Sequence, residues 1–157
     1  TIFMLVHQLN KIIKLDKSEL DANYFKDENQ KYLIITGANP FYGNLKEEKF
    51  REIISKVKDD YGDEYIILYK PHPVALPDEK QQKLLNSFDI KVLPGTIPME
   101  AIMFMYPNIK LGGFASSLYM SAEEGQTEFF FSKGKDELVS PLNILYDDLF
   151  SNAKFYN

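Results

Sequence analysis

Two adjacent serines, Ser116 and Ser117, lie in the stretch LGGFASSLYMSAEEG, where their hydroxyls and backbone N–H groups could bind an anion together. Gly112 and Gly113 precede them, and glycine lets a backbone pass close to a ligand. Residues 116–124 have the pattern of a helix, whose first N–H groups carry partial positive charge. The same serines could instead act only as helix N-caps, a common use of serine. The stretch therefore predicts either an anion site or a capped helix without a ligand.

A histidine lies between two prolines in KPHP, residues 70–73, directly after an apolar run. The prolines restrict the backbone on both sides of His72 and so limit the directions in which its imidazole can point. An imidazole can donate a proton or stabilise a phosphate near neutral pH. A histidine that only caps a loop carbonyl is the alternative, and these residues alone favour neither. His7 lies on an expected helix and is assigned a structural role.

Glu100 stands near the start of an expected short helix that begins at Pro98. The helix dipole favours a carboxylate there, so Glu100 taken alone is interpreted as a helix-stabilising residue. The alternative is a bidentate acceptor for two ribose hydroxyls, the role of an acidic residue in dinucleotide-binding folds. The chain has neither a P-loop nor a GxGxxG fingerprint, and no histidines or carboxylates have metal-ligand spacing. The sequence therefore predicts no NTPase, dehydrogenase or metal site.

Alternating strands and helices must position these groups. Continuous apolar runs such as YLIIT and YIILY are typical of parallel strands that are covered on both faces. We predict a Rossmann-like α/β fold, a parallel sheet with helices on both faces, whose ligands bind beyond the carboxyl ends of the strands. The expected strands are 32–36, 65–69, 90–93, 109–111 and 127–131. The expected helices are 1–14, 47–60, 78–87, 98–105, 116–124 and 141–150.

Composition narrows the classes of function. The 157 residues suit one domain, in which 1–30 form an N-terminal helix and a charged connection and 31–157 form the Rossmann-like domain. A net charge of −5 without a basic stripe argues against a nucleic-acid partner. The chain lacks cysteine, which excludes disulfides and thiolate chemistry. The apolar run TIFMLV is too short to span a bilayer and has no basic leader.

Taken together, the motifs resemble the nucleotide-binding half of bacterial sialyltransferases of the GT-B type, which carry paired HP and SS motifs. The order here is YKPHP and then IPMEAIMFMYPNIKLGGFASSLYMS, while YLIITGANPFYGN resembles the first strand and loop of the same half. The resemblance runs from about Tyr32 to about Phe131. It implies that 31–157 form one half of a GT-B fold and bind a nucleotide sugar.

The resemblance also implies a role for each matched residue. His72 would assist departure of the CMP phosphate, Glu100 would bind the ribose hydroxyls, and the serine pair Ser116 and Ser117 would bind the phosphate. Lys70-Pro71 stands where some members have Lys-Gly. This departure lies next to the expected position of the cytosine ring. The other implied substrate-binding residues are Thr36, Gly37, Lys70, Pro71, Pro73 and Pro98, with Phe41, or as second choice Tyr42, near the acceptor sugar.

The implied activity is transfer of sialic acid from CMP-sialic acid to a glycan acceptor with inversion, without a cofactor or metal. In the family an Asp of the other, N-terminal domain is the general base, and this chain offers no match to it. The chain is therefore expected to be the donor-binding half of a larger enzyme and inactive by itself. Bacterial lipooligosaccharide or capsule biosynthesis, in the cytoplasm or at the cytoplasmic face of the inner membrane, is implied. Peripheral membrane association and the oligomeric state stay open.

Two other classes of function remain. One is a different GT-B enzyme that uses a nucleotide sugar, either a glycosyltransferase or an epimerase. The other is non-catalytic: a Rossmann-like nucleotide-binding or interaction module that has the cleft without the chemistry. The identity of the bound nucleotide distinguishes these readings.

Overall fold

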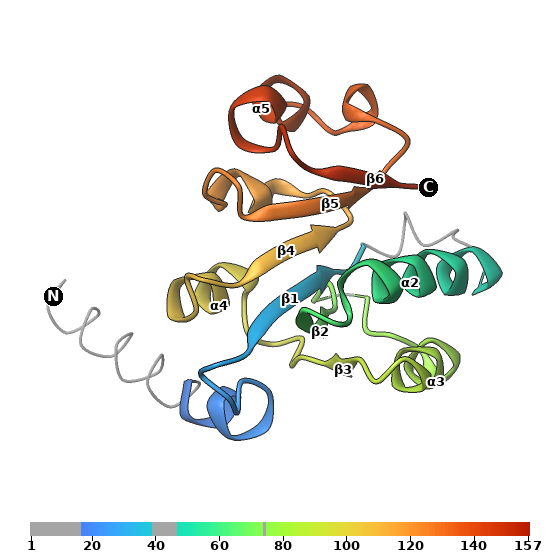
Figure 1. Ribbon diagram of the computed structural model, residues 1–157, viewed down its shortest axis with the longest axis vertical. Coiled ribbons are helices and arrows are strands. Elements are labelled where there is room, and N and C mark those ends of the chain that lie inside the picture. Colours follow the sequence, from blue (N-terminus) through green and yellow to red (C-terminus); the bar gives the residue numbers. More distant parts are fainter. Residues whose placement is uncertain (1–16, 39–46, 74) are drawn as a thin grey trace, which may run out of the picture.

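A six-stranded sheet forms the centre of the molecule (Figure 1). The computed structural model describes residues 17–38, 47–73 and 75–157. The strand order is β3-β2-β1-β4-β5-β6, and every neighbouring pair is parallel. The chain therefore moves outward from β1 to β3 and then returns to place β4 on the other side of β1. The strands are β1 (Lys31–Thr36), β2 (Tyr65–Lys70), β3 (Lys91–Val92), β4 (Lys110–Gly113), β5 (Thr127–Phe131) and β6 (Lys154–Tyr156).

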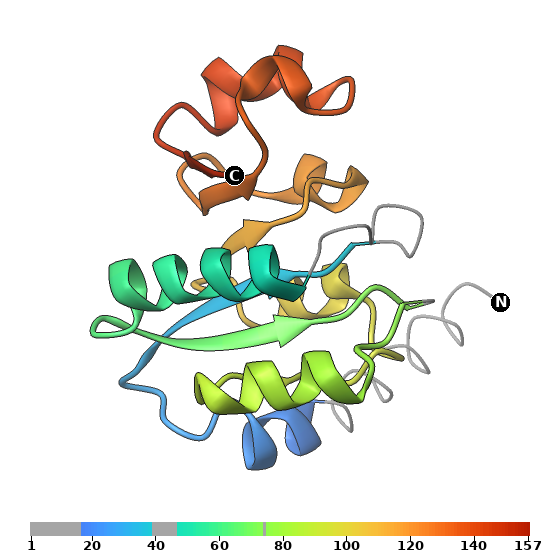
Figure 2. The ribbon, with the colours of Figure 1, turned by 90° about the vertical axis from the view of Figure 1, so that its right-hand side faces the viewer.

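Helices cover both faces of this sheet. The α-helices are α2 (Glu47–Tyr61), α3 (Glu79–Ser87), α4 (Met99–Met105) and α5 (Leu142–Leu149). Leu33 and Ile35 of β1 pack in the cluster that includes α2 and α3, whereas Ile34 packs in the cluster that includes α4 and α5. This alternation follows from the two-residue period of a strand. Figure 2 shows α2 and α3 together on one side of the sheet. The predicted fold class is confirmed.

Local sequence explains where the helices form. The apolar stripe of α2, which includes Ile53, Ile54 and Val57, is buried against the sheet. Asp78 caps α3 by accepting from the Gln81 N–H, and the Gln81 side chain accepts in return from the Asp78 N–H. These reciprocal bonds set the start of α3 one residue after the predicted start. The predicted helix 1–14 lies outside the described residues.

The predicted helix 116–124 is wrong in type and length. A 3₁₀ helix, η2 (Ser117–Ser121), replaces it, and Ala122 after it is extended. The Glu123 N–H donates to the Gln126 side chain, which in turn donates to the carbonyl of Ile109. The Glu123 N–H is therefore bonded to a side chain and does not form the backbone bond that a longer helix would need. β6 and a second 3₁₀ turn, η3 (Lys135–Glu137), were not predicted, because three-residue elements carry too little periodicity.

The charged segment before β1 also contributes to the core. Residues 17–23 are helical, and the Leu20 and Phe25 side chains are buried in the same cluster as α4. Phe25 stacks on Tyr106, with ring centroids 4.0 Å apart. The segment is therefore more than a solvated connection. The division between residues 1–30 and 31–157 stays a prediction.

The glycine pair at the end of β4 is required by internal packing, which the sequence did not indicate. A Cβ on Gly112 would lie 2.4 Å from the Phe129 ring, and a Cβ on Gly113 would lie 2.6 Å from the Thr36 carbonyl oxygen. Gly113 also has a positive φ of 123°, a conformation that side chains disfavour. Both glycines thus let β4 approach its neighbours.

Gly113→Ala is expected to lower the free energy of unfolding by about 2–4 kcal/mol, because backbone strain adds to the contact with Thr36. Gly134→Ala is the matched control, since that glycine has extended backbone and open space around its Cβ position. Urea denaturation measures both changes. Equal stability of the two variants would contradict this account of Gly113.

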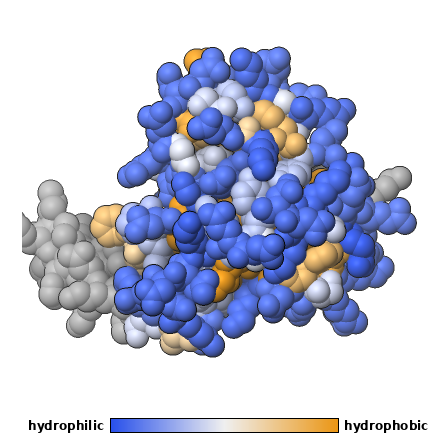
Figure 3. Space-filling view, in the orientation of Figure 1, coloured by the Kyte–Doolittle hydropathy of each residue, from blue (hydrophilic) through white to orange (hydrophobic). Residues whose placement is uncertain are grey.

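The surface is mostly hydrophilic in the view of Figure 3, with scattered apolar side chains. Phe104 and Leu76 are among the exposed large apolar residues, at 75% and 65% exposure. Within the described parts of the chain, no helix combines the length and the apolar character needed to cross a membrane.

Candidate functional site

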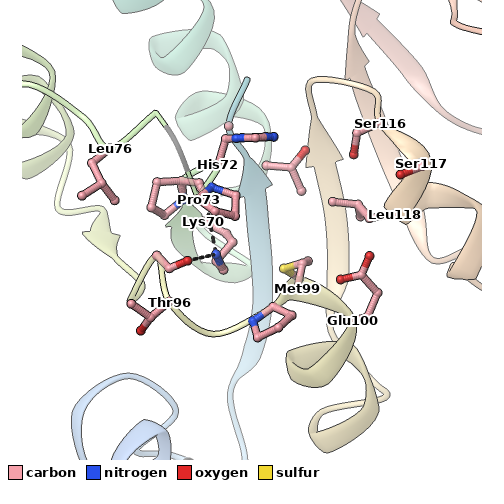
Figure 4. A pocket seen from close by; sticks show the side chains of 15 residues that line it. Lys70, His72, Pro73, Leu76, Thr96, Met99, Glu100, Ser116, Ser117 and Leu118 are labelled. Carbon is pink, nitrogen blue, oxygen red and sulfur yellow. Dashed lines mark hydrogen bonds between the residues drawn. The ribbon is translucent and has the colours of Figure 1, made fainter. Parts of the chain in front are cut away.

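A pocket of about 480 Å³ opens beyond the carboxyl ends of β1, β2 and β4 (Figure 4). Its walls come from the end of β1, the loop after β2, the loop between β3 and α4, and the turn after β4. β1 lies between β2 and β4, where the strand order changes direction. Crevices at this point of a doubly wound sheet are the usual ligand sites of such folds.

The structure brings the predicted site residues together around this one pocket. The predicted residues that line it are Thr36, Gly37, Lys70, Pro71, His72, Pro73, Pro98, Glu100, Ser116 and Ser117. Phe41 and its alternative Tyr42 lie outside the described residues. The lining residues that sequence reasoning missed are Leu76, Gly95, Thr96, Met99 and Leu118. Their individual roles in binding stay predictions.

The backbone of His72 is held in a tight turn. The Ala75 N–H donates to the His72 carbonyl at 3.0 Å, and the two residues form an antiparallel bridge. Gly37 packs closely on the other side, where an added Cβ would lie 3.2 Å from the His72 backbone nitrogen and 2.6 Å from the Tyr69 hydroxyl oxygen. The absence of a side chain at Gly37 therefore lets the loop after β2 sit next to the end of β1.

Ser116 and Ser117 reach the pocket from the other side, beyond the end of β4 (Figure 4). Ser116 has extended backbone at the start of η2, and its side chain makes no capping hydrogen bond there. This disfavours the alternative in which Ser116 serves only as an N-cap. Because η2 is a five-residue 3₁₀ helix, its dipole is small, and an anion would rely mainly on the two hydroxyls and nearby N–H groups.

Glu100 lies exposed in the first turn of α4 and points toward the pocket below the serine pair (Figure 4). Among the described residues it forms no ion pair, and its charge opposes part of the lowering of the Lys70 pKa that burial causes. An exposed carboxylate at the rim can accept two neighbouring hydroxyl groups of a ligand. Both interpretations of Glu100, dipole stabilisation and hydroxyl binding, are compatible with this position.

Lys70 is a buried cation at the base of the pocket, with an exposed fraction of 4%. Its Nζ donates to the carbonyl of Pro71 at 3.1 Å and to that of Gly95 at 3.5 Å. The ammonium therefore joins the loop after β2 to the loop after β3. Burial lowers the pKa of Lys70 from its ordinary value, and the Glu100 charge opposes part of that change. Sequence reasoning considered the Lys70 backbone and missed this side-chain link.

The lowered pKa of Lys70 gives a pH signature. The unfolded chain keeps the Lys70 proton up to about pH 10.5, whereas the folded chain releases it at lower pH. The burial penalty is thus complete below the folded pKa and disappears as pH rises toward the unfolded value. We therefore compare the free energy of unfolding of the wild type with that of Lys70→Met. The difference, wild type minus variant, should rise between the lowered folded pKa and about pH 10.5. Urea denaturation at several pH values tests this, with exposed Lys133→Met as the control. A constant difference would contradict it.

The hydroxyl of Thr36 is directed into the protein. Thr36 is buried, and its Oγ1 lies 3.2 Å from the Gly112 carbonyl oxygen and 3.1 Å from the Phe114 carbonyl oxygen. The Thr36 carbonyl accepts the Phe114 N–H at 3.1 Å. Thr36 therefore supports the pocket wall by tying the end of β1 to the turn after β4.

In the described part of the chain, no cluster of three or more His, Cys, Asp or Glu side chains could hold a metal ion. The charged or titratable side chains that line the pocket are Lys70, His72 and Glu100. The hydroxyl-bearing residues that line it are Thr36, Thr96, Ser116 and Ser117. The arrangement can bind an anion beside a group that carries several hydroxyls, with an imidazole in the lining of the same pocket.

Comparison with known proteins adds independent findings. The model of the family "Sialyltransferase PMO188" matches residues 12–152. The fold is similar to a crystal structure of a sialyltransferase from Photobacterium damselae, residues 113-497, which correspond to its GT-B domain. That similarity has a TM-score of 0.65 and 22% sequence identity, and it covers 94% of this chain but 43% of that one. No curated protein matches the chain. At this identity the structural match shows the fold alone.

Proposed function

Because this chain belongs to the sialyltransferase family whose model matches residues 12–152, we propose that it is the donor-binding half of a bacterial GT-B sialyltransferase. The proposed reaction transfers sialic acid from CMP-sialic acid to a glycan acceptor with inversion. The observation that carries this proposal is the single pocket in which His72, Glu100 and the serine pair meet. The HP and SS motifs are far apart in the sequence, and the fold brings them to one site.

The proposed chemistry follows from charge development on the donor. As the bond between sialic acid and CMP breaks, negative charge grows on the CMP phosphate. Donors that are already in place stabilise this charge more in the transition state than in the ground state. Ser116 and Ser117 would donate to the phosphate oxygens, and His72 would donate a proton or a hydrogen bond to the departing group. Glu100 would accept from the ribose hydroxyls.

His72 and Glu100, the imidazole and the carboxylate of the described pocket, are assigned to the departing CMP and to the ribose, so neither is assigned as the general base for the acceptor hydroxyl. We assign the base to a second domain, as in the GT-B arrangement, so the chain by itself binds donor without transferring sugar. No metal or cofactor has a role in the proposed reaction. The proposed place of action is the cytoplasm or the cytoplasmic face of the inner membrane, where nucleotide-sugar donors are made.

Calorimetry with CMP, UDP and GDP tests the proposal. We expect CMP to bind most tightly, with an affinity that added EDTA leaves unchanged. Preference for UDP or GDP would overturn the sialyltransferase reading in favour of another nucleotide-sugar enzyme. Absence of binding to all three would favour a non-catalytic module.

A further inference from the structure

Tyr119 is a wholly buried tyrosine two residues after Ser117, and it is not among the predicted site residues. Its ring packs against Phe130 and Phe150, at centroid distances of 5.0 and 6.4 Å. These contacts connect η2 to β5 and to the end of α5. The ring thus fixes the side chain in the core, while its hydroxyl extends toward the end of β1.

The Tyr119 hydroxyl lies 2.6 Å from Thr36 Oγ1. A threonine hydroxyl has one proton, and carbonyl oxygens can only accept. Since Thr36 Oγ1 also contacts the carbonyls of Gly112 and Phe114, its own proton goes to one of these. Tyr119 is therefore the donor to Thr36. Burial raises the pKa of Tyr119, which keeps the phenol protonated and able to donate.

The turn that carries the serines is anchored in the core by the Tyr119 ring and at its start by the bond from the Phe114 N–H to the Thr36 carbonyl, and the Tyr119 hydroxyl adds a side-chain link from the turn itself to the end of β1. η2 is formed by short-range bonds such as Tyr119 N–H to the Ser116 carbonyl, at 3.1 Å. Bonds within η2 shape the turn, ring packing seats it in the core, and the bond between the Tyr119 and Thr36 hydroxyls is directional and sets its distance from the end of β1. Thr36 pairs with Lys70 of β2 and with Gly113 of β4, and Gly37 after it contacts the backbone of His72. The Tyr119–Thr36 bond joins the serine side of the pocket to the histidine side.

We propose that Tyr119 is a positioning residue, whose hydroxyl holds the serine pair at the distance from the end of β1 and from His72 that a nucleotide phosphate requires. This inference rests on the proposed function, because it assigns the serine pair to the donor phosphate. Tyr119 itself does not line the pocket. It would act on the ligand only through Thr36 and the turn.

Tyr119→Phe in the full chain tests the proposal, because phenylalanine keeps the ring packing and removes only the hydroxyl. We expect CMP binding to weaken by about three- to tenfold, the equivalent of one lost buried hydrogen bond. We also expect faster amide hydrogen exchange in peptides that span residues 114–120. In the complete enzyme, kcat should fall together with donor affinity.

Tyr32→Phe is the matched control. Tyr32 is a buried tyrosine at the opposite end of β1, and its hydroxyl bonds to the Asp27 backbone at 3.1 Å. It packs in the same core cluster as Tyr119. This control should lose stability without losing CMP affinity. If Tyr32→Phe weakens CMP binding as much as Tyr119→Phe does, general destabilisation explains both effects and the proposal fails.

Thr36→Val provides a second line of test, since valine keeps the shape and removes the acceptor. If the two hydroxyls act as one unit, the double variant Thr36→Val/Tyr119→Phe should bind CMP no more weakly than Thr36→Val alone. Additive losses would overturn the proposed pairing. If the wild type binds no nucleotide, the proposed function fails separately, and amide exchange then decides whether Tyr119 positions the turn. Unchanged exchange and unchanged affinity in Tyr119→Phe would refute the inference.

Discussion

His72→Ala in the complete enzyme is expected to lower turnover by about 10²- to 10³-fold while changing CMP affinity by less than about fivefold. The reason is that the imidazole acts on charge that develops as the sugar leaves, and this charge is small in the ground state. Steady-state kinetics with the CMP-sugar donor measure turnover, and calorimetry measures CMP affinity. A large loss of CMP affinity with unchanged turnover at saturating donor would assign His72 to ground-state binding.

His72→Asn is the informative companion variant. Asparagine can still donate a hydrogen bond but cannot transfer a proton at neutral pH. Partial recovery of turnover relative to alanine would assign His72 to hydrogen-bond stabilisation of the phosphate, and no recovery would assign it to proton transfer. Full turnover in His72→Ala would refute both roles.

The second large effect concerns the serine pair. Replacing both Ser116 and Ser117 by alanine should lower CMP affinity by about 10²- to 10⁴-fold, because each hydroxyl bonded to a charged oxygen contributes about 1.5–3 kcal/mol. Turnover should fall as well, since the same donors stabilise the leaving phosphate. Binding of cytidine, which lacks the phosphate, should be unaffected. Calorimetry with CMP and cytidine separates the two ligands.

Ser121→Ala is the control for the serine pair. Ser121 is exposed at the last position of the same η2 turn and does not line the pocket. Its replacement should leave CMP affinity unchanged. Equal affinity of wild type and the double alanine variant for CMP would place the phosphate elsewhere in the pocket.

Much of this fold could be predicted because its strands are continuous apolar runs and its long helices carry clear apolar stripes. YLIIT and YIILY became β1 and β2, and the stripe on residues 50–57 became the buried face of α2. The η2 turn was missed because a long-range contact decides it. The Gln126 side chain donates to the Ile109 carbonyl and accepts from the Glu123 N–H, and no local sequence pattern predicts these bonds.

The candidate site likewise contains residues that the sequence could predict and residues that it could not. Motif residues such as His72 and Glu100 could be placed at strand ends from the order of elements, and the structure puts them around one pocket. Lys70 and Tyr119 show what local reasoning misses. Their functions depend on partners 25 and 83 residues away, Gly95 and Thr36, which only tertiary packing brings near. Resemblance to a family therefore identifies candidate ligand-binding residues more readily than the buried residues that support them.

The lengths of the two outermost strands matter for the behaviour of the chain in concentrated solution. β3 has two residues and β6 has three, and these strands form the two borders of the sheet. Each border thus offers only a short row of unpaired backbone groups to a second molecule. Such brevity is a known protection against intermolecular strand addition. The long and strongly apolar strands β1 and β2, which would polymerise readily if exposed, are shielded in the interior of the sheet.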